Sequence, residues 1–316
     1  MKKYLLPDGG NFYKANLHSH TNLSDGNLSP EDAKKHYKDN GYSVLAYTDH
    51  NKFVTHNDLT DDEFLALNGV EININTPDYG KKYGKTCHFC MISLTDRPIE
   101  NLFEGAERIY SPECVTAMMQ KARDNGYFVT YNHPTWSMEG YNDYTNYHGM
   151  HAMEIYNNEC YLLGHDEHNN KQYDDMLKNG EKIFCIATDD NHNKPERGSE
   201  IGGFTMIKAD DLNYTSITQA LLRGDFYASE GPAIEELYIE DKKLCIKCSS
   251  AAEICLNTPY RIAASKKACR YPLTEAVFNL RGDEGYFRLT VTDEKGKKAY
   301  THAYFTDEIF GEGKNQ

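Results

Sequence analysis

The chain has 316 residues, of which 39% are hydrophobic and 26% charged, the composition of an ordinary globular protein. Its formal net charge of -14 argues against a long basic track, so we expect no stable nucleic-acid partner. Without an apolar run of roughly 18 residues or the apolar core of a signal peptide, we expect a cytoplasmic protein with no membrane partner. Nine irregularly spaced cysteines predict reduced thiols.

Predicted strands and helices alternate over the first two thirds of the chain. Helix starts, each with an N-cap serine and a first-turn proline, are predicted at Ser29-Pro30 and Ser111-Pro112. The predicted strands cover residues 11–17, 44–47, 70–74, 87–94, 127–131, 152–156, 183–187 and 204–208. A series of βα-like units predicts the α/β class and a parallel barrel.

The pattern changes after Gly231-Pro232 to short alternating strands, predicted at residues 236–240, 244–248 and 287–291. We therefore predict two domains, a barrel over residues 1–231 and a small, sandwich-like all-β domain over residues 232–316.

Histidines and acids interrupt or follow one predicted strand after another, which is where a barrel keeps its active site. A single His-x-His pair is weak evidence, but a solvated surface has no reason to repeat such residues in successive units. The candidate metal ligands are His18, His20, Asp25, His50, Glu71, His88, His133, Asp190 and His192. Imidazole and carboxylate groups together suit zinc, manganese or iron, and nine are too many for one ion, so we expect two to three divalent ions.

These residues belong to motifs that resemble those of the PHP family, the polymerase and histidinol phosphatase superfamily, over roughly residues 11–232. The motifs are His18-Ser19-His20, Ser24-Asp25-Gly26, Thr48-Asp49-His50-Asn51, Gly69-Val70-Glu71, His88, His133-Pro134 and Asp190-Asn191-His192. The resemblance implies a distorted (β/α)7 barrel and a trinuclear metal centre.

The resemblance also implies how the ligands are shared among three ions. The first ion would be held by His18, His20, Glu71 and Asp190. Glu71 would bridge to a second ion held also by His88 and His133, while Asp25, His50 and His192 would hold the third. Some relatives have histidine where this chain has Asp25, which leaves the choice of metal open.

Three divalent ions and three carboxylates would give the site a charge of about +3 inside an acidic protein. Such a centre activates a bound water near neutral pH and clamps a phosphoryl group, so the nucleophile is a metal-bound water and no side-chain base is assigned. We therefore predict a metal-dependent phosphoesterase that hydrolyses a small phosphorylated molecule of the nucleotide or sugar phosphate class.

Two residues outside the ligand set are candidates for substrate binding. Arg197 follows the last ligands, and a guanidinium binds phosphate through two parallel hydrogen bonds. His165, or His168 in the same polar stretch, is a candidate to protonate a leaving group. The alternative for both is an exposed loop position. Trp136, beside His133-Pro134, is a candidate to stack on a base or sugar, with packing as the alternative.

Two other functions remain open. The Asp25 and His50 motifs, with residues 222–229, also resemble a PHP branch of carbamate and aryl ester hydrolases, whose neutral substrates would not need Arg197. A non-catalytic metal-binding module is the other alternative, and it is disfavoured because the sequence lacks none of the expected ligands.

Overall fold

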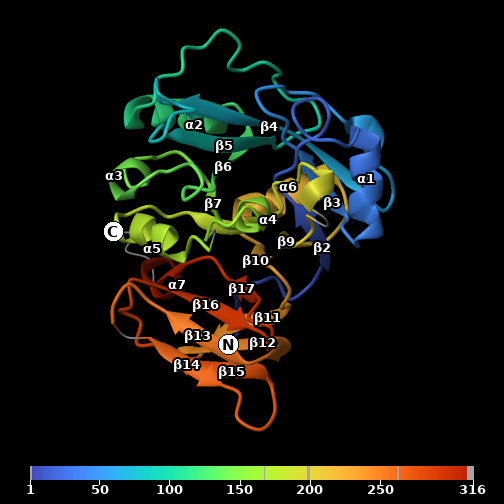
Figure 1. Ribbon diagram of the computed structural model, residues 1–316. Coiled ribbons are helices and arrows are strands. Elements are labelled where there is room, and N and C mark those ends of the chain that lie inside the picture. Colours follow the sequence, from blue (N-terminus) through green and yellow to red (C-terminus); the bar gives the residue numbers. More distant parts are fainter. Residues whose placement is uncertain (1, 167, 198–199, 262, 312–316) are drawn as a thin grey trace.

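The computed structural model describes residues 2–166, 168–197, 200–261 and 263–311. It is a mixed α/β structure, as the sequence predicts. Figure 1 shows helices α1 (Pro30–Asp39) and α2 (Pro112–Asp124) in the upper half, α5 (Asn170–Lys178) at the left edge near mid-height, and the carboxyl-terminal strands gathered in the lower half.

The strands of the first part of the chain are β1 (Lys3–Tyr4), β2 (Asn11–Asn16), β3 (Val44–Tyr47), β4 (Leu65–Asn75), β5 (Thr86–Ser93), β6 (Tyr127–Asn132), β7 (Ala152–Asn157), β8 (Phe184–Thr188), β9 (Phe204–Ala209) and β10 (Phe226–Ser229). The other helices there are α3 (Tyr141–Tyr144), α4 (Asn158–Leu162) and α6 (Tyr214–Arg223), with 3-10 turns η1 (Asn57–Leu59) and η2 (Pro195–Arg197). The remaining elements are β11 (Ile234–Glu240), β12 (Lys243–Ala251), β13 (Glu253–Asn257), β14 (Ala264–Lys267), β15 (Leu273–Asn279), β16 (Tyr286–Thr292), β17 (Lys298–Tyr300), β18 (Tyr304–Phe305) and α7 (Thr306–Phe310).

The two helix starts read from the sequence are confirmed. The hydroxyl of Ser29 accepts a hydrogen bond from the backbone N–H of Asp32 at 3.1 Å, and Ser111 caps α2 in the same way through Cys114. Each cap satisfies a backbone donor that has no partner within the helix, which is worth about 1 kcal/mol.

The large sheet follows the order β9-β2-β3-β4-β5-β6-β7-β8 through the first part of the chain. The sequence predicts uniformly parallel strands, but the strand pairing in this sheet is mixed. Strand β5 runs antiparallel to both β4 and β6, and β9 runs antiparallel to β2. Residues 76–85 join β4 to β5 as a hairpin, closed by the hydrogen bond from Thr76 N–H to Lys85 O at 2.9 Å. A hairpin connection enforces antiparallel pairing, whereas parallel neighbours need a crossover.

The chain segments that follow β2 and β8 also meet, although these strands lie far apart in the sheet order. Ser19 pairs with Asn191 in a parallel bridge, and the backbone N–H groups of His20 and Asp190 donate to Asn191 and His18. The sheet therefore curves, and the curvature brings residues 18–20 beside residues 190–192.

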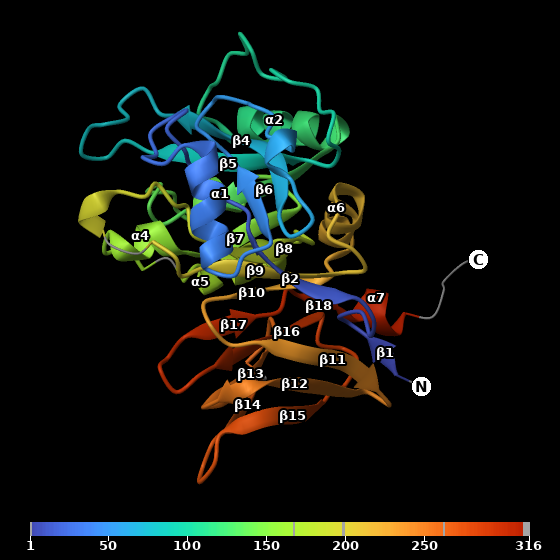
Figure 2. The same ribbon diagram turned by 90° about the vertical axis from the view of Figure 1, so that its right-hand side faces the viewer.

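The carboxyl-terminal strands form two layers around an apolar core. The sheet β1-β11-β12-β15 contributes Leu237 and Ile246, and the β14-β13-β16-β17 end of the large sheet contributes Ile254 and Leu289. Because β10 pairs with β17, the large sheet is continuous across residue 231, and the domain boundary there stays a prediction. Figure 2 shows β1 lying beside β11 in this lower half.

None of the helices in the described part of the chain has both the length and the apolar character needed to cross a bilayer.

Candidate metal centre

The nine candidate ligands converge at one edge of the curved sheet. His18 and His20 follow β2, Asp25 lies in the turn beyond, and His50, His133 and the Asp190–His192 pair follow β3, β6 and β8. Glu71 lies within β4, and His88 lies near the start of β5. Since β5 is antiparallel, its first residues lie at the edge where its neighbours end, and His88 is in register with Asn73 and Asn132.

Glu71 is at the centre of this cluster and is only 1% exposed. Its carboxylate oxygens lie close to ring nitrogens of five histidines. These are His18 at 3.2 Å, His20 at 3.4 Å, His50 at 3.0 Å, His88 at 3.0 Å and His133 at 3.2 Å. A single buried carboxylate thus contacts ligands that the family resemblance assigns to different ions, as a bridging ligand would.

Asp190 is the second buried carboxylate. Its Oδ1 lies 3.2 Å from His18 Nε2 and 3.0 Å from His20 Nε2, and its Oδ2 lies 3.7 Å from His133 Nε2. His18 and His20 therefore each contact both Glu71 and Asp190, the carboxylates expected around the first ion. His88 and His133 both lie against Glu71 Oε1.

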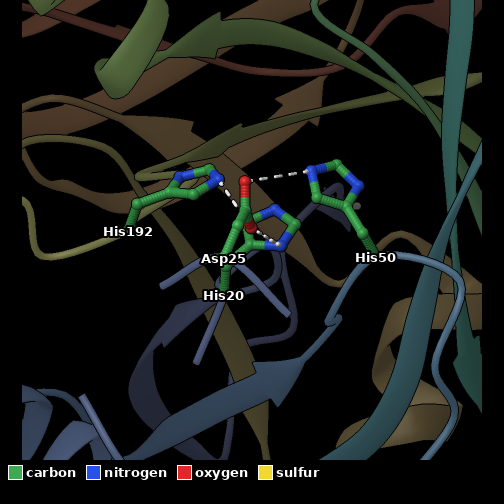
Figure 3. A group of neighbouring side chains, drawn as sticks. All are labelled: His20, Asp25, His50 and His192. Atoms are coloured by element: carbon green, nitrogen blue, oxygen red, sulfur yellow. Dashed lines mark ion pairs between the residues drawn. The ribbon is translucent and has the colours of Figure 1, made fainter. Parts of the chain in front are cut away.

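The third group is built around Asp25, and Figure 3 shows three imidazoles turned toward its carboxylate. The nearest carboxylate oxygens lie 3.3 Å from His192 Nε2, 3.9 Å from His50 Nε2 and 3.9 Å from His20 Nδ1. The ring of His20 stacks between those of His50 and His192, with centroids 4.3 and 4.2 Å away. His20 is thus shared between the first and third groups.

The cluster fits divalent cations, because atoms that bear lone pairs face one another inside it. His18 Nδ1 donates to Glu154 at 2.7 Å, so in the neutral ring, which is the form that binds a metal ion, the Nε2 lone pair is directed at Glu71 and Asp190. Among the described residues, the buried atoms Glu71 Oε2 and Asp190 Oδ1 make no hydrogen bond, although imidazole nitrogens lie 3.0 Å from each. Buried carboxylate oxygens seldom stay unpaired, and a cation between these atoms would satisfy them.

The electrostatics keep the central carboxylate ionised. Burial alone would raise the pKa of Glu71, but His18, His88 and His50 outweigh burial and hold that pKa well below its usual range. Burial lowers the pKa of His88, whereas at His133 the hydrogen bond to Glu71 overcomes the effect of burial and raises the pKa to about 9. Glu71 is therefore an anionic ligand throughout the neutral pH range.

Two of the candidate ligands have unusual backbone angles. His133 has φ 26° and Asp190 has φ 50°, in the left-handed region that non-glycine residues seldom occupy. Such conformations cost on the order of 1–3 kcal/mol each and are found where function fixes the direction of a side chain.

A supporting layer of acids was not recognised from the sequence. Glu154 accepts hydrogen bonds from His18 Nδ1 and from Thr188 Oγ1, both at 2.7 Å, and from the backbone N–H of His133. Asp49 accepts from Thr21 and Ser24 and holds the turn that carries Asp25. The sequence does contain a feature that could have identified Glu154: it is an acid within an apolar strand, the same feature by which Glu71 was selected.

An open cavity of about 390 Å³ lies over the centre. Besides metal-ligand candidates, its wall includes Asn73, Tyr79, Trp136, Glu159, Cys160, Leu163, Lys194 and Arg197. Trp136 contacts His88 and His133 edge-on, with centroids 5.5 and 5.2 Å away. The side chain of Arg197 reaches this wall and forms an ion pair with Glu159. Among the described residues, His165 lies outside the cavity wall.

Solved structures with a similar fold include a two-domain protein of Bacteroides vulgatus that contains a predicted PHP-like metal-dependent phosphoesterase. The two proteins are 16% identical, and the similarity covers 96% of this chain and 98% of that chain with a TM-score of 0.50. The chain therefore has the fold of a solved protein with a PHP-like region, as the motifs predict.

Two further structures match less of the chain. One is an amidohydrolase from Chromobacterium violaceum, 14% identical over 58% of this chain and 89% of that chain, with a TM-score of 0.40. The other is a candidate metal-dependent phosphoesterase from Bifidobacterium adolescentis, 13% identical over 60% of this chain and 91% of that chain, with a TM-score of 0.39. No family model and no curated protein matches the sequence.

Proposed function

We propose that this protein is a metal-dependent phosphoesterase of the PHP family that hydrolyses small phosphate esters at a trinuclear centre. The observation that carries the proposal is the convergence of six imidazoles on two buried carboxylates, Glu71 and Asp190, each of which has one oxygen that makes no hydrogen bond to a described residue. Divalent cations that nitrogen and oxygen ligands prefer, such as zinc, manganese or iron, would fit this arrangement.

The ligands divide among three ions as the family resemblance implies. His18, His20, Glu71 and Asp190 would hold the first ion. Glu71, His88 and His133 would hold the second, and Asp25, His50 and His192 the third. When bound, the ions would supply an activated water and the positive charge that stabilises a phosphoryl group. The protein holds the ligands in place through Glu154 and Asp49, so the centre is preorganised for the reaction.

The cavity wall supports a small phosphorylated substrate. Arg197 and Lys194 add cationic groups beside the centre, and Trp136 offers an aromatic face or edge to the leaving group. A volume of about 390 Å³ lies in the range of small-molecule sites, which suits the nucleotide or sugar phosphate class.

A carbamate or carboxyl ester hydrolase at the same centre is the second candidate. It is favoured by the ion pair between Arg197 and Glu159, which offsets the charge of the arginine that a phosphate would use. A neutral substrate would leave this ion pair undisturbed.

We also infer a distorted (β/α)7 barrel and a cytoplasmic location. The barrel is supported by the bridge between Ser19 and Asn191, which links the segments after β2 and β8. The location is supported by the nine cysteines, all of which are free thiols. The domain boundary proposed near residue 231 coincides with the change from βα units to short strands.

The test is elemental analysis of the purified protein, combined with hydrolysis assays on phosphomonoesters, phosphodiesters, carboxyl esters and carbamates, with and without a chelator. Two to three ions per chain and chelator-sensitive release of phosphate are the expected results. A metal-loaded protein that acts only on neutral esters would establish the second candidate, and a protein without stoichiometric metal would refute both.

A further inference from the structure

Glu159 is the point at which the candidate metal centre meets the candidate substrate arginine. It lies in α4, is 5% exposed, and was not recognised from the sequence. One carboxylate oxygen accepts a hydrogen bond from His192 Nδ1, and the other accepts one from Arg197 Nη1. A single buried carboxylate thus joins a residue of the third metal group to a cation in the cavity wall.

The backbone around Glu159 is fixed relative to the centre. Its N–H donates to Asp189 O at 3.0 Å, directly before the ligand Asp190. Asn157 caps α4 through the N–H of Cys160, and its amide donates to Asp190 Oδ2 at 3.1 Å. The position of the Glu159 carboxylate is therefore set by the strand end that supplies two metal ligands.

The contact with His192 helps to determine which ring nitrogen faces the third group. Because Nδ1 donates to Glu159 and also lies 2.9 Å from the carbonyl oxygen of Asp190, the Nε2 lone pair is directed at Asp25, 3.3 Å away. Glu154 does the same for His18 on the opposite side of the centre. Carboxylates that orient ligand histidines in this way typically contribute 10–100-fold to metal affinity.

The contact with Arg197 holds a guanidinium at the cavity wall. Arginine carries five N–H donors, so an ion pair through Nη1 leaves other donors available for a second anion. An arginine held in one orientation loses less conformational freedom when phosphate binds. We expect this gain in phosphate affinity to exceed the loss that comes from Glu159 offsetting part of the positive charge.

We propose that Glu159 is a positioning residue that serves the third metal group through His192 and the substrate phosphate through Arg197. The inference rests on the proposed phosphoesterase function. According to this inference, the Glu159 side chain affects both metal affinity and the discrimination between charged and neutral substrates. Substitutions at other residues would change only one of these two properties.

The experiment compares Glu159→Gln with the wild-type protein. Metal binding is measured by elemental analysis and by calorimetric titration of zinc or manganese into the metal-free protein. We expect Glu159→Gln to bind one ion about 10–100-fold more weakly. Under saturating metal, we expect its KM for phosphomonoesters to rise several-fold, with little change in kcat or in KM for neutral esters.

Three control variants separate the two effects. Arg197→Met is expected to raise KM for phosphomonoesters without changing metal affinity. Glu154→Gln is expected to weaken metal binding without selective loss of phosphomonoester binding. Glu196→Gln removes an exposed acid next to Arg197 and is expected to change neither quantity. Circular dichroism of each metal-free variant verifies that the chain is folded.

The possible failures are distinguishable. A wild-type protein that binds metal and hydrolyses phosphomonoesters, with Glu159→Gln unchanged in metal affinity and in KM, would overturn the inference alone. If Glu159→Gln changed only the metal affinity or only the KM for phosphomonoesters, the proposal that Glu159 serves both sites would be overturned. A wild-type protein without metal and without phosphomonoesterase activity would overturn the proposed function and this inference together.

Discussion

A buried carboxylate away from the metal centre makes the stability of this protein depend on pH. Glu139 is 8% exposed, and its carboxylate accepts hydrogen bonds from the hydroxyls of Tyr110, Tyr131 and Tyr147 at 2.9, 2.5 and 2.6 Å. Burial raises the pKa of Glu139 from 4.5 to about 7, although the three hydroxyls act in the opposite direction. The folded protein therefore binds this proton more tightly than the unfolded chain does.

The sign of the effect follows from this difference in pKa. Protonation of Glu139 stabilises the fold, and the stabilisation is complete below the unfolded pKa of about 4.5 and is lost as the pH rises through about 7. A difference of about 2.5 between the two pKa values corresponds to ~3 kcal/mol, since one pKa unit is worth about 1.4 kcal/mol. Most of this change, about 2.5 kcal/mol, falls between pH 5 and pH 8.5.

The variant Glu139→Gln tests this reasoning, because glutamine has the shape of the protonated acid and does not titrate. We expect its free energy of unfolding in urea to exceed that of the wild type by an amount that grows by about 2.5 kcal/mol from pH 5 to pH 8.5. Other titrating groups are common to both proteins and cancel in the difference. The exposed Glu275→Gln variant is the matched control and should show no such trend. A difference that stays flat over this pH range would refute the reasoning.

Three further predictions concern the metal centre and the contact between α5 and β16. Glu154→Gln should lower the affinity for one ion about 10–100-fold in calorimetric titrations, and unchanged affinity would contradict the role given to Glu154. Asp174→Ala leaves Arg288, which is 2% exposed, without its bidentate partner and should reduce the free energy of unfolding by about 3 kcal/mol; a loss below 1 kcal/mol would argue against it. The single tryptophan, Trp136, lies against two candidate ligands, so adding zinc or manganese to the metal-free protein should change its fluorescence. Trp136→Phe should abolish that signal, and a wild-type spectrum insensitive to metal would contradict the placement.

Local structure was predicted well because its signals are local. The strand at residues 44–47 and the two serine-proline helix starts are found where the sequence places them. The direction of β5 was not predictable from its own residues, because alternation along a strand is the same in parallel and antiparallel pairs. The hairpin at residues 76–85 determines that direction, and it contains the glycines and the Pro-Asp pair typical of a turn.

In the candidate site, too, some residues could be identified from the sequence and others could not. The sequence identified nine groups that the structure brings together, because successive strand ends meet at one edge of the sheet. It did not identify Glu159, since nothing in residues 157–162 indicates that this acid faces His192 and Arg197, more than 30 positions away along the chain. Contacts of this kind depend on how α4 packs against the rest of the protein. The residue types and their spacing do not indicate this packing.

The pairing of β1 with β11 ties the beginning of the chain to its later part. Lys3 and Tyr4 are in register with Ile239 and Tyr238, and the Lys3 ammonium donates to Ile309 O at 2.8 Å. During synthesis on the ribosome, β1 therefore cannot pair in this sheet until β11, more than 200 residues later in the sequence, has been made.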